Sequence, residues 1–350
     1  MITFSIIQKS QIEGAHRLDA EYYQPEYLEL ENNLKKFGNK LKLFGESLEN
    51  GNSLTGGATP LGADYPESGI KFLRVQNIMP GYLDFSDIVF IDEKIHKGQL
   101  KRSKLIDGDV LLTITGVSYG KSAVYKSEFG EANINQHSVK MHFNKNLIPE
   151  YAAMFLNSKY GKFQSDRKIT GNTRPALAYE EIKEYKIPTI DISLQKEIKI
   201  ICDESASEDK KAIELYSKAG NLLLEELGLK DFDTEENLSS IVNLSDVKSA
   251  GRMDAEYFQP KYSKLIEKLK NPKPLDKIAR RRKGIVKIDT KKDYKYIEIS
   301  DVNVGSGEIN YNILSARELP ANAKIKIDGG ELIVSKVRPT RGAVGIIPDD

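Results

Sequence analysis

Apolar and polar positions follow two different periods along the first half of the chain. Between residues 40 and 145, glycine, aspartate and asparagine interrupt short apolar runs, which is typical of strands and turns. Residues 110–114 form such a run after the turn sequence Asp107-Gly108-Asp109, and residues 138–143 alternate apolar and polar side chains. Over residues 149–157 the apolar spacing becomes helical. This order predicts an α+β fold with a mixed, β-rich core.

Shorter elements flank this region. We expect a strand and loop over residues 1–16, and a helix over 25–36 that begins at a proline and ends at Gly38. Further strands are expected over 70–75 and 122–125. A short helix over 179–185 and a strand over 185–188 follow them.

The longest periodic segment covers residues 192–227. Alternate steps of four and three residues trace a seam, which polar residues interrupt in the middle. Its apolar positions are Leu194, Ile198, Ile201, Leu215 and Leu222. Gly228 suits the end of this helix, and about 36 residues at 1.5 Å each give a rod of roughly 54 Å. No other segment of the sequence matches this length, so we expect its partner helix to be absent or to come from another chain, which includes a homodimer.

Nine residues of the chain occur twice. Arg17-Leu18-Asp19-Ala20-Glu21-Tyr22-Tyr23-Gln24-Pro25 returns 235 residues later as Arg252-Met253-Asp254-Ala255-Glu256-Tyr257-Phe258-Gln259-Pro260, with seven positions identical. Weaker similarity links 71–78 to 295–302 at an offset of 224, 106–108 to 327–329 at 221, and 123–124 to 343–344 at 220. A period of this length indicates duplicated domains, and the shrinking offset indicates shorter loops in the second copy.

The expected organisation therefore has four parts. Residues 1–190 form a first domain, 191–230 a spacer helix, 231–240 an acidic linker, and 241–350 a second domain of the same kind. The second copy of the repeat breaks off about halfway, so we expect this second domain to be incomplete.

Composition and charge exclude several classes of protein. The single cysteine, Cys202, excludes a disulfide framework and fits a reducing cytosol, so we expect a cytoplasmic protein. The sequence has no apolar run long enough to span a bilayer and no signal-peptide pattern at its N-terminus. Net charge is only +1, but Lys and Arg gather in residues 157–175 and 273–292, and acids in 203–237. Such segregation suits contact with phosphate on one side, although ordinary solvated surfaces show it too.

The sequence lacks catalytic and metal-binding patterns. Gly116-Val117-Ser118-Tyr119-Gly120-Lys121-Ser122 resembles a phosphate-binding loop, but three residues separate its glycines where that loop requires four. Four histidines and one cysteine do not suggest a metal site. We therefore expect a non-catalytic chain without a cofactor or metal ion.

Polar loop residues are the candidates for DNA contact. Asn and Gln can pair with adenine, and Arg with guanine or phosphate, although the same side chains also hold turns together. In the first domain the candidates are Thr55, Arg74, Gln76, Asn77, Thr115, Ser118, Tyr119, Lys121, Asn135, Gln136, Thr170, Asn172, Thr173 and Arg174. In the second domain they are Arg281, Arg282, Lys336, Arg338 and Arg341.

An ordered series of motifs gives the chain a family resemblance. The series comprises Asp109-Val110-Leu111-Leu112-Thr113, Gly120-Lys121-Ser122-Ala123-Val124-Tyr125, Asn135-Gln136, Tyr151 with Phe155-Leu156-Asn157-Ser158, Gly171-Asn172-Thr173-Arg174-Pro175-Ala176-Leu177, Ile187-Pro188 and Leu194-Gln195-Lys196-Glu197-Ile198. Over residues 20–228, and partly again over 241–350, the chain resembles the target-recognition domains of type I restriction–modification specificity subunits.

The resemblance implies tandem recognition domains that each read half of a bipartite duplex DNA site. It also implies two long helices paired as a coiled coil, methyltransferase subunits that clasp the chain, and a motor-nuclease subunit that joins for restriction. Catalysis would belong to those partners. Two alternatives remain open: the recognition portion of a fused methyltransferase-nuclease enzyme, and a scaffold that bridges methyltransferase subunits without reading DNA.

The second copy departs from the family pattern. It lacks counterparts of Asn135-Gln136, of residues 171–177 and of the long helix. Glu298 stands where the first copy has Arg74, and Ser300 stands where it has Gln76. Different side chains at matching positions are what two different half-sites would require.

Overall fold

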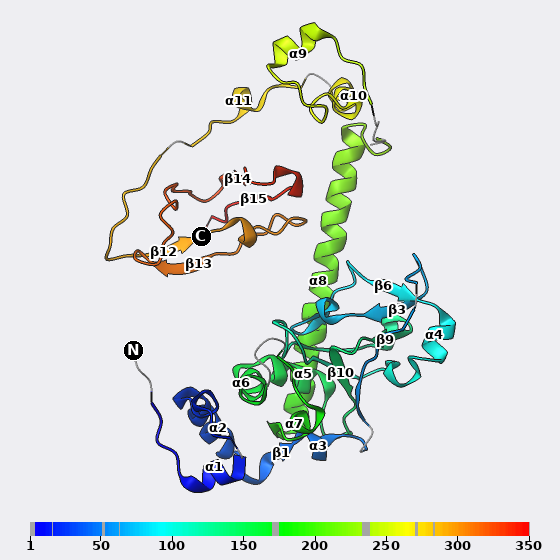
Figure 1. Ribbon diagram of the computed structural model, residues 1–350, viewed down its shortest axis with the longest axis vertical. Helices are drawn as coiled ribbons and strands as arrows, with labels where there is room; N and C mark the ends of the chain where they lie inside the picture. Colours follow the sequence, from blue (N-terminus) through cyan, green and yellow to red (C-terminus); the bar gives the residue numbers. More distant parts are fainter. Residues whose placement is uncertain are drawn as a thin grey trace. The chain divides into compact units, whose positions relative to one another are not determined.

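The computed structural model of the chain describes all residues except 1–3, 16, 51–52, 63, 170–174, 233–238, 270–271, 283 and 350. It divides into two compact units, Met1–Lys210 and Lys211–Asp350, each of which is treated by itself (Figure 1). Within the described ranges, no helix has both the length and the apolar character that crossing a membrane requires.

The first unit is built on two small sheets. Four antiparallel strands lie in the order β2 (Leu54–Gly56), β10 (Ser138–Met141), β7 (Val110–Thr113) and β8 (Ser122–Val124). Three strands lie in the order β6 (Val89–Ile91), β3 (Ile70–Leu73) and β9 (Ala132–Ile134), with β3 and β9 parallel. Shorter pairs join β1 (Leu41–Leu43) to β11 (Lys186–Pro188), and β4 (Ile78–Met79) to β5 (Tyr82–Leu83). The expected combination of helices and sheets is confirmed.

Strand β7 lies at the centre of the core because both of its faces are buried. Val110 and Leu112 belong to an apolar cluster that includes Tyr185, whereas Leu111 belongs to a second cluster around Leu73. Successive side chains of a strand point to opposite faces, so an unbroken apolar run fits a strand that is covered on both sides. The loops that leave β7 are therefore anchored to a rigid strand.

Helices surround these sheets (Figure 1). They are α1 (Lys9–Ala15), α2 (Pro25–Lys35), α3 (Phe44–Ser47), α4 (Glu93–Lys97), α5 (Pro149–Asn157), α6 (Lys159–Lys168) and α7 (Tyr179–Lys183). The helices expected over 25–36, 149–157 and 179–185 are confirmed within two residues. The strand expected at the N-terminus is wrong because α1 forms there, and α6 has no counterpart among the expected elements. A Cβ on Gly161 would lie 2.4 Å from the Leu156 Cα, so the sharp turn between α5 and α6 requires glycine.

Helix α8 (Ile192–Glu226) confirms the long helix, and its first turns dock on the first unit. The buried Gln195 side chain accepts the Ile148 backbone N–H at 2.8 Å and donates to the Ile190 carbonyl at 2.9 Å. Further along, Asp203 forms an ion pair with Lys126. Cys202 is half-buried beside this contact. These bonds hold the start of the helix against the rest of the first unit.

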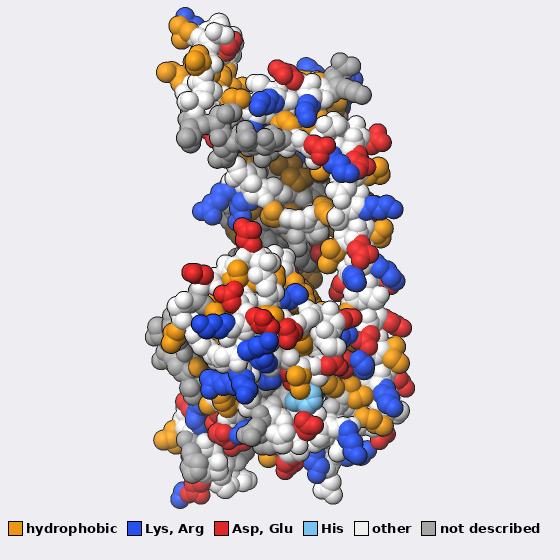
Figure 2. Space-filling model, turned by 90° about the vertical axis from the view of Figure 1, so that its right-hand side faces the viewer, with side chains coloured by type: hydrophobic (Ala, Val, Ile, Leu, Met, Phe, Trp, Pro, Cys, Tyr) orange, Lys and Arg blue, Asp and Glu red, His pale blue; other side chains and the backbone are white. Residues whose placement is uncertain are grey.

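Beyond Asp203 the side chains of the helix are no longer buried. Every side chain from residue 204 to 228 is exposed, and Leu215 and Leu222 keep 66% and 57% of their surface accessible. Leu194 and Ile201 are exposed as well, whereas Ile198 packs against the core of the first unit. The seam expected from the sequence therefore needs one correction, since the docking of Gln195 turns Ile198 inward. The space-filling view shows apolar side chains at the surface among charged ones (Figure 2).

The second unit contains few buried side chains. Its elements are α9 (Leu244–Ala250), α10 (Pro260–Lys268), α11 (Leu275–Ile278), β12 (Asp293–Tyr296), β13 (Asn312–Ser315), β14 (Leu332–Val334) and β15 (Val344–Ile346). Of the apolar residues described in this unit, Val302 and Ala343 are buried. Its strands form two separate antiparallel pairs, β12 with β13 and β14 with β15.

The repeated nonapeptide adopts the same local structure in both units. Arg17 binds Asp19 through two hydrogen bonds of 2.6 and 2.7 Å, and Arg252 binds Asp254 through two of 2.8 Å. Each arginine also lies over the ring of the tyrosine five residues later, at 5.1 and 4.5 Å from the ring centroid. A proline then begins α2 in one unit and α10 in the other.

Hydrogen bonds between β14 and β15 repeat those between β7 and β8 at a constant offset of 222 residues. The matched donor–acceptor pairs are Gly108–Tyr125 with Gly330–Ile347, and Thr113–Lys121 with Ser335–Ala343. The offsets of 221 and 220 expected here from the sequence are therefore wrong. Short apolar runs tolerate a shift of one or two residues in an alignment, whereas the hydrogen-bond register of a strand pair does not.

Candidate nucleic-acid interface

The turn that follows β3 carries three of the candidate residues. The Arg74 backbone N–H donates to Asn77 Oδ1 at 2.9 Å, and Asn77 Nδ2 donates to the Asp84 carbonyl at 2.9 Å. Asn77 is only 1% exposed, so its amide holds the turn together and does not face solvent. The expectation that Asn77 reads a base is corrected on this ground.

Arg74 and Gln76 meet at one carboxylate. Arg74 Nη2 donates to the Asp87 carbonyl at 2.7 Å and to Asp87 Oδ2 at 3.0 Å. Gln76 Nε2 donates to the same Oδ2 at 3.1 Å. Nothing in the sequence pointed to Asp87, because the loop that carries it reaches the turn only when β3 pairs with β6.

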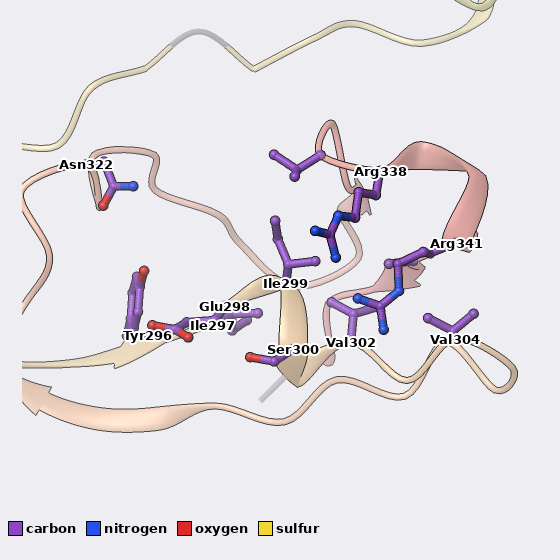
Figure 3. A pocket seen from close by; sticks show the side chains of 12 residues that line it. Tyr296, Ile297, Glu298, Ile299, Ser300, Val302, Val304, Asn322, Arg338 and Arg341 are labelled. Carbon is purple, nitrogen blue, oxygen red and sulfur yellow. The ribbon is translucent and has the colours of Figure 1, made fainter.

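The second unit contains the same turn with other side chains. The Glu298 N–H donates to Asp301 Oδ2 at 2.7 Å, which matches the bond between Arg74 and Asn77. Glu298 and Ser300 line a hollow of about 730 Å³ in this unit. Arg338 and Arg341 project into the same hollow from the segment before β15 (Figure 3). The structure thus brings two candidate arginines to the turn of the second copy that matches the turn at Arg74 and Gln76.

The β7–β8 loop carries Ser118, Tyr119 and Lys121, all half-buried. The Ser118 carbonyl accepts a bond from the Thr113 hydroxyl at 2.6 Å. Tyr119 donates its hydroxyl to Asp166 Oδ1 at 2.8 Å, and burial together with that bond raises its pKa to about 12. The loop is therefore clamped to α6, and it forms no helix of the kind that follows a nucleotide-binding loop.

Gln136 is the exposed member of a network that joins two loops. Gln136 Nε2 lies 2.9 Å from His137 Nε2, and Thr115 Oγ1 lies 2.7 Å from His137 Nδ1. A donating amide requires that His137 Nε2 accept, which places the ring proton on Nδ1, facing Thr115. Asn135 is buried, and its Oδ1 accepts the His137 backbone N–H at 3.2 Å. Gln136 and Thr115 thus lie together near the surface, whereas Asn135 supports them from below.

Thr55 lines a different hollow, of about 400 Å³, together with Lys140 and His142. Asp109, 1% exposed, lies at its base and contacts His142 Nδ1 at 3.0 Å and Lys140 Nζ at 3.3 Å. This cluster was not expected from the sequence, where Asp109 reads as part of a turn. The Asp109 carboxylate offsets the positive charge of Lys140.

Several basic side chains of residues 157–175 form ion pairs with acidic side chains of the same chain. Arg167 pairs with Glu31 at 2.7 Å, and Lys168 pairs with Glu181 and Glu184. These two cations therefore stabilise the fold. Four of the candidates, Thr170, Asn172, Thr173 and Arg174, lie outside the described residues.

Acid should weaken the unit through Glu31. Burial alone would raise the pKa of its carboxyl, but the hydrogen bond from Arg167 and the charges of Lys186 and Arg167 lower it from 4.5 to about 2. A carboxyl with a depressed pKa stabilises the fold fully above about pH 4.5 and loses that contribution as the pH falls towards 2. The loss is about 3 kcal/mol at a 1.36 kcal/mol cost per pKa unit. Urea unfolding between pH 6 and 2.5 should show a smaller acid loss for Glu31→Gln than for the unmodified chain, and equal losses would refute the assignment.

The remaining candidates of the second unit differ in how they are held. Arg282 is paired with Asp328 at 2.8 Å and with Glu331 at 2.7 Å. Arg281 and Lys336 are exposed. Among the residues that the structure describes, no group of three His, Cys, Asp or Glu side chains could hold a metal ion.

Comparisons with known proteins find likeness in solved structures alone. No family model matches the chain, and no curated protein matches it. Solved structures similar to this chain include a chain from a study of complex assembly and conformational transition of the type I restriction–modification system, the HsdS subunit from Thermoanaerobacter tengcongensis, and the S subunit of a type I restriction–modification system from M. genitalium.

The extent of this likeness is small. Identities are 13%, 14% and 13%, with 62%, 57% and 59% of this chain covered. This chain spans about half the length of those neighbours, 53%, 48% and 55%, and each TM-score is 0.35. A TM-score at this level carries no weight in assigning the function.

Proposed function

We propose that the chain is a non-catalytic DNA sequence-specificity subunit of a type I restriction–modification complex. It recognises a bipartite duplex DNA site through its two units and positions methyltransferase subunits on that site. A motor-nuclease subunit joins the same complex for restriction. The chain itself needs no cofactor, because the methyl transfer and cleavage take place on its partners.

The observation that carries this proposal is the repeated turn with exchanged side chains. Arg74 and Glu298 begin turns with the same backbone hydrogen bond to a residue three positions later. A protein that reads two different half-sites needs one frame used twice with different contact residues. Gln76 and Ser300, each exposed two positions further along its turn, differ in the same way.

The long helix supports the same proposal. Two weak readers joined by a rod gain affinity, because the second contact forms at a high effective concentration. The rod also sets the separation of the half-sites, as the spacing of the two readers does in dimeric DNA-binding proteins. Its exposed apolar residues, among them Leu215 and Leu222, suit a partner helix.

Methylation mapping tests the proposal. The chain would be co-expressed with the methyltransferase encoded beside it, and methylated bases would be located by long-read sequencing. A bipartite motif with two distinct halves supports the proposal with both units reading DNA. A palindromic motif supports a homodimer of first units, and a lack of methylation contradicts the proposal.

Giving the turn at Arg74 and Gln76 the side chains of the second copy should change the DNA motif that is methylated. Arg74→Glu with Gln76→Ser gives the first unit the side chains of the second, and each lost base contact should reduce discrimination by about 1–3 kcal/mol. We expect the mapped motif to change in one half only. Lys94→Glu, at an exposed residue of α4, is the control and should leave the motif unchanged. An unchanged motif in the double variant would contradict the role of this turn.

The exposed stretch of α8 favours one alternative, a scaffold that binds methyltransferase subunits without reading DNA. The two functions differ in their response to salt, because DNA binding releases counterions and weakens steeply as salt rises. A flat dependence of DNA binding on salt between 50 and 200 mM would favour the scaffold.

A further inference from the structure

The cluster of Arg74, Gln76 and Asp87 offers a defined set of hydrogen-bonding groups. Asp87 accepts hydrogen bonds from Arg74 Nη2 through its backbone carbonyl and its Oδ2, and from one hydrogen of Gln76 Nε2. Arg74 Nε is buried without a hydrogen-bond partner among the described residues. The groups left for a ligand are the two hydrogens of Arg74 Nη1, the second hydrogen of Gln76 Nε2 and the acceptor Gln76 Oε1. The cluster therefore presents two arginine donors beside an amide that can both donate and accept.

Asp87 lies in an insertion that the second copy of the repeat lacks. The Asp84 N–H donates to the carbonyl of Asn77, and the Asn310 N–H donates to the matching carbonyl of Asp301. Strand β6 begins five residues after Asp84, whereas β13 begins two residues after Asn310. The first copy thus has three additional residues at this place, and Asp87 falls within that stretch.

The carboxylate decides what kind of ligand the cluster fits. An exposed carboxylate bonded to Arg74 repels phosphate, so this arginine is a poor contact for the DNA backbone. The major-groove edge of a G·C pair presents the guanine acceptors N7 and O6 beside the cytosine donor N4. The two donors of Arg74 Nη1 next to the acceptor Gln76 Oε1 are complementary to that order. An A·T pair places the adenine donor N6 beside the acceptor N7, so it offers the two arginine donors no pair of neighbouring acceptors.

We propose that Arg74 and Gln76 read one G·C base pair in the major groove and that Asp87 is the positioning residue that holds them in place. The inference rests on the proposed DNA-reading function. Arg74 donates to guanine and Gln76 Oε1 accepts from cytosine N4. Asp87 fixes the direction of both side chains, and it excludes phosphate from the arginine.

The test measures base preference and general affinity separately. The full chain would be selected against a random duplex DNA library at fixed salt, and the enriched motifs of the unmodified chain, Asp87→Ala and Asp87→Asn would be compared. We expect both variants to lose at least about fivefold preference for G·C at a single position. Affinity for DNA without the motif should stay equal or rise, because a negative charge is removed beside a cation.

Asp92→Asn is the matched control, since it removes an exposed carboxylate that caps no backbone N–H of α4. It should keep the motif of the unmodified chain. A fall in affinity for all sequences in the Asp87 variants would point to a merely structural role and overturn the inference. Sequence preference that persists unchanged in these variants would overturn it too, while leaving the proposed function intact. No sequence preference in the unmodified chain would overturn both.

Discussion

Replacing Arg167 with alanine should lower the free energy of unfolding of the first unit by about 3 kcal/mol. The guanidinium pairs with Glu31 at 2.7 Å, and its Nε donates to the Tyr22 carbonyl at 2.8 Å. Both charged side chains are mostly withdrawn from water, at 11% and 20% exposure. Removing one partner of a pair with little solvent leaves the other charge poorly compensated, and Lys186 at 3.2 Å limits the loss.

Arg167 also joins the repeated nonapeptide to α6. Its guanidinium lies 4.2 Å from the centroid of the Tyr22 ring, a residue of that repeat. Chemical denaturation of the variant and of Lys183→Ala gives the comparison. Lys183 pairs with Glu180 at the surface, so its removal should cost less than about 1 kcal/mol. Similar losses in the two variants would show that the buried pair contributes little.

Placing glutamates at Leu215 and Leu222 should abolish assembly through α8 while leaving the fold unchanged. Both leucines are exposed, so the substitutions remove no packing within the chain. A buried carboxylate without a partner costs several kcal/mol in an interface, which corresponds to about a hundredfold weaker binding or more. The measurement is the mass of the complex with the methyltransferase, or of the chain alone, by light scattering after size-exclusion chromatography.

A second double variant controls for added charge. Ser217→Glu with Asn221→Glu puts two carboxylates on another side of the same helix, because each residue advances the direction of the side chain by 100°. Assembly should persist in this control. If the leucine variants assemble as well as the control, the exposed seam is not the partner surface.

The sequence predicted those elements whose own residues show a clear spacing of apolar side chains. Strand β7 has an apolar run without interruption, and α8 has apolar residues at helical spacing on both sides of its polar middle. Helix α6 was missed because Lys-Tyr-Gly-Lys-Phe-Gln-Ser-Asp-Arg-Lys has neither apolar period nor a strong start signal. Tertiary contacts of Phe163 and Arg167 hold it instead, and no periodicity within the segment records them.

The residues of the candidate site were likewise predicted only in part. The sequence located the exposed turn at Arg74 and Gln76, because a polar run after a strand marks a rim. It could not separate Asn77 from them, since an amide that bonds the backbone and one that faces a ligand are the same residue type. Asp87 stayed hidden because its partners lie across a strand pair, and their meeting depends on register.

The docked start of α8 can be followed in solution through Cys202. It is the one cysteine of the chain and lies half-buried at the contact that Gln195 and Asp203 secure. Burial and the neighbouring charges of Glu150 and Asp203 raise the pKa of its thiol. A shielded, protonated thiol reacts slowly with alkylating reagents. The rate at which Cys202 is alkylated therefore reports how often the start of α8 separates from the rest of the first unit. The unmodified protein needs no added label for this measurement.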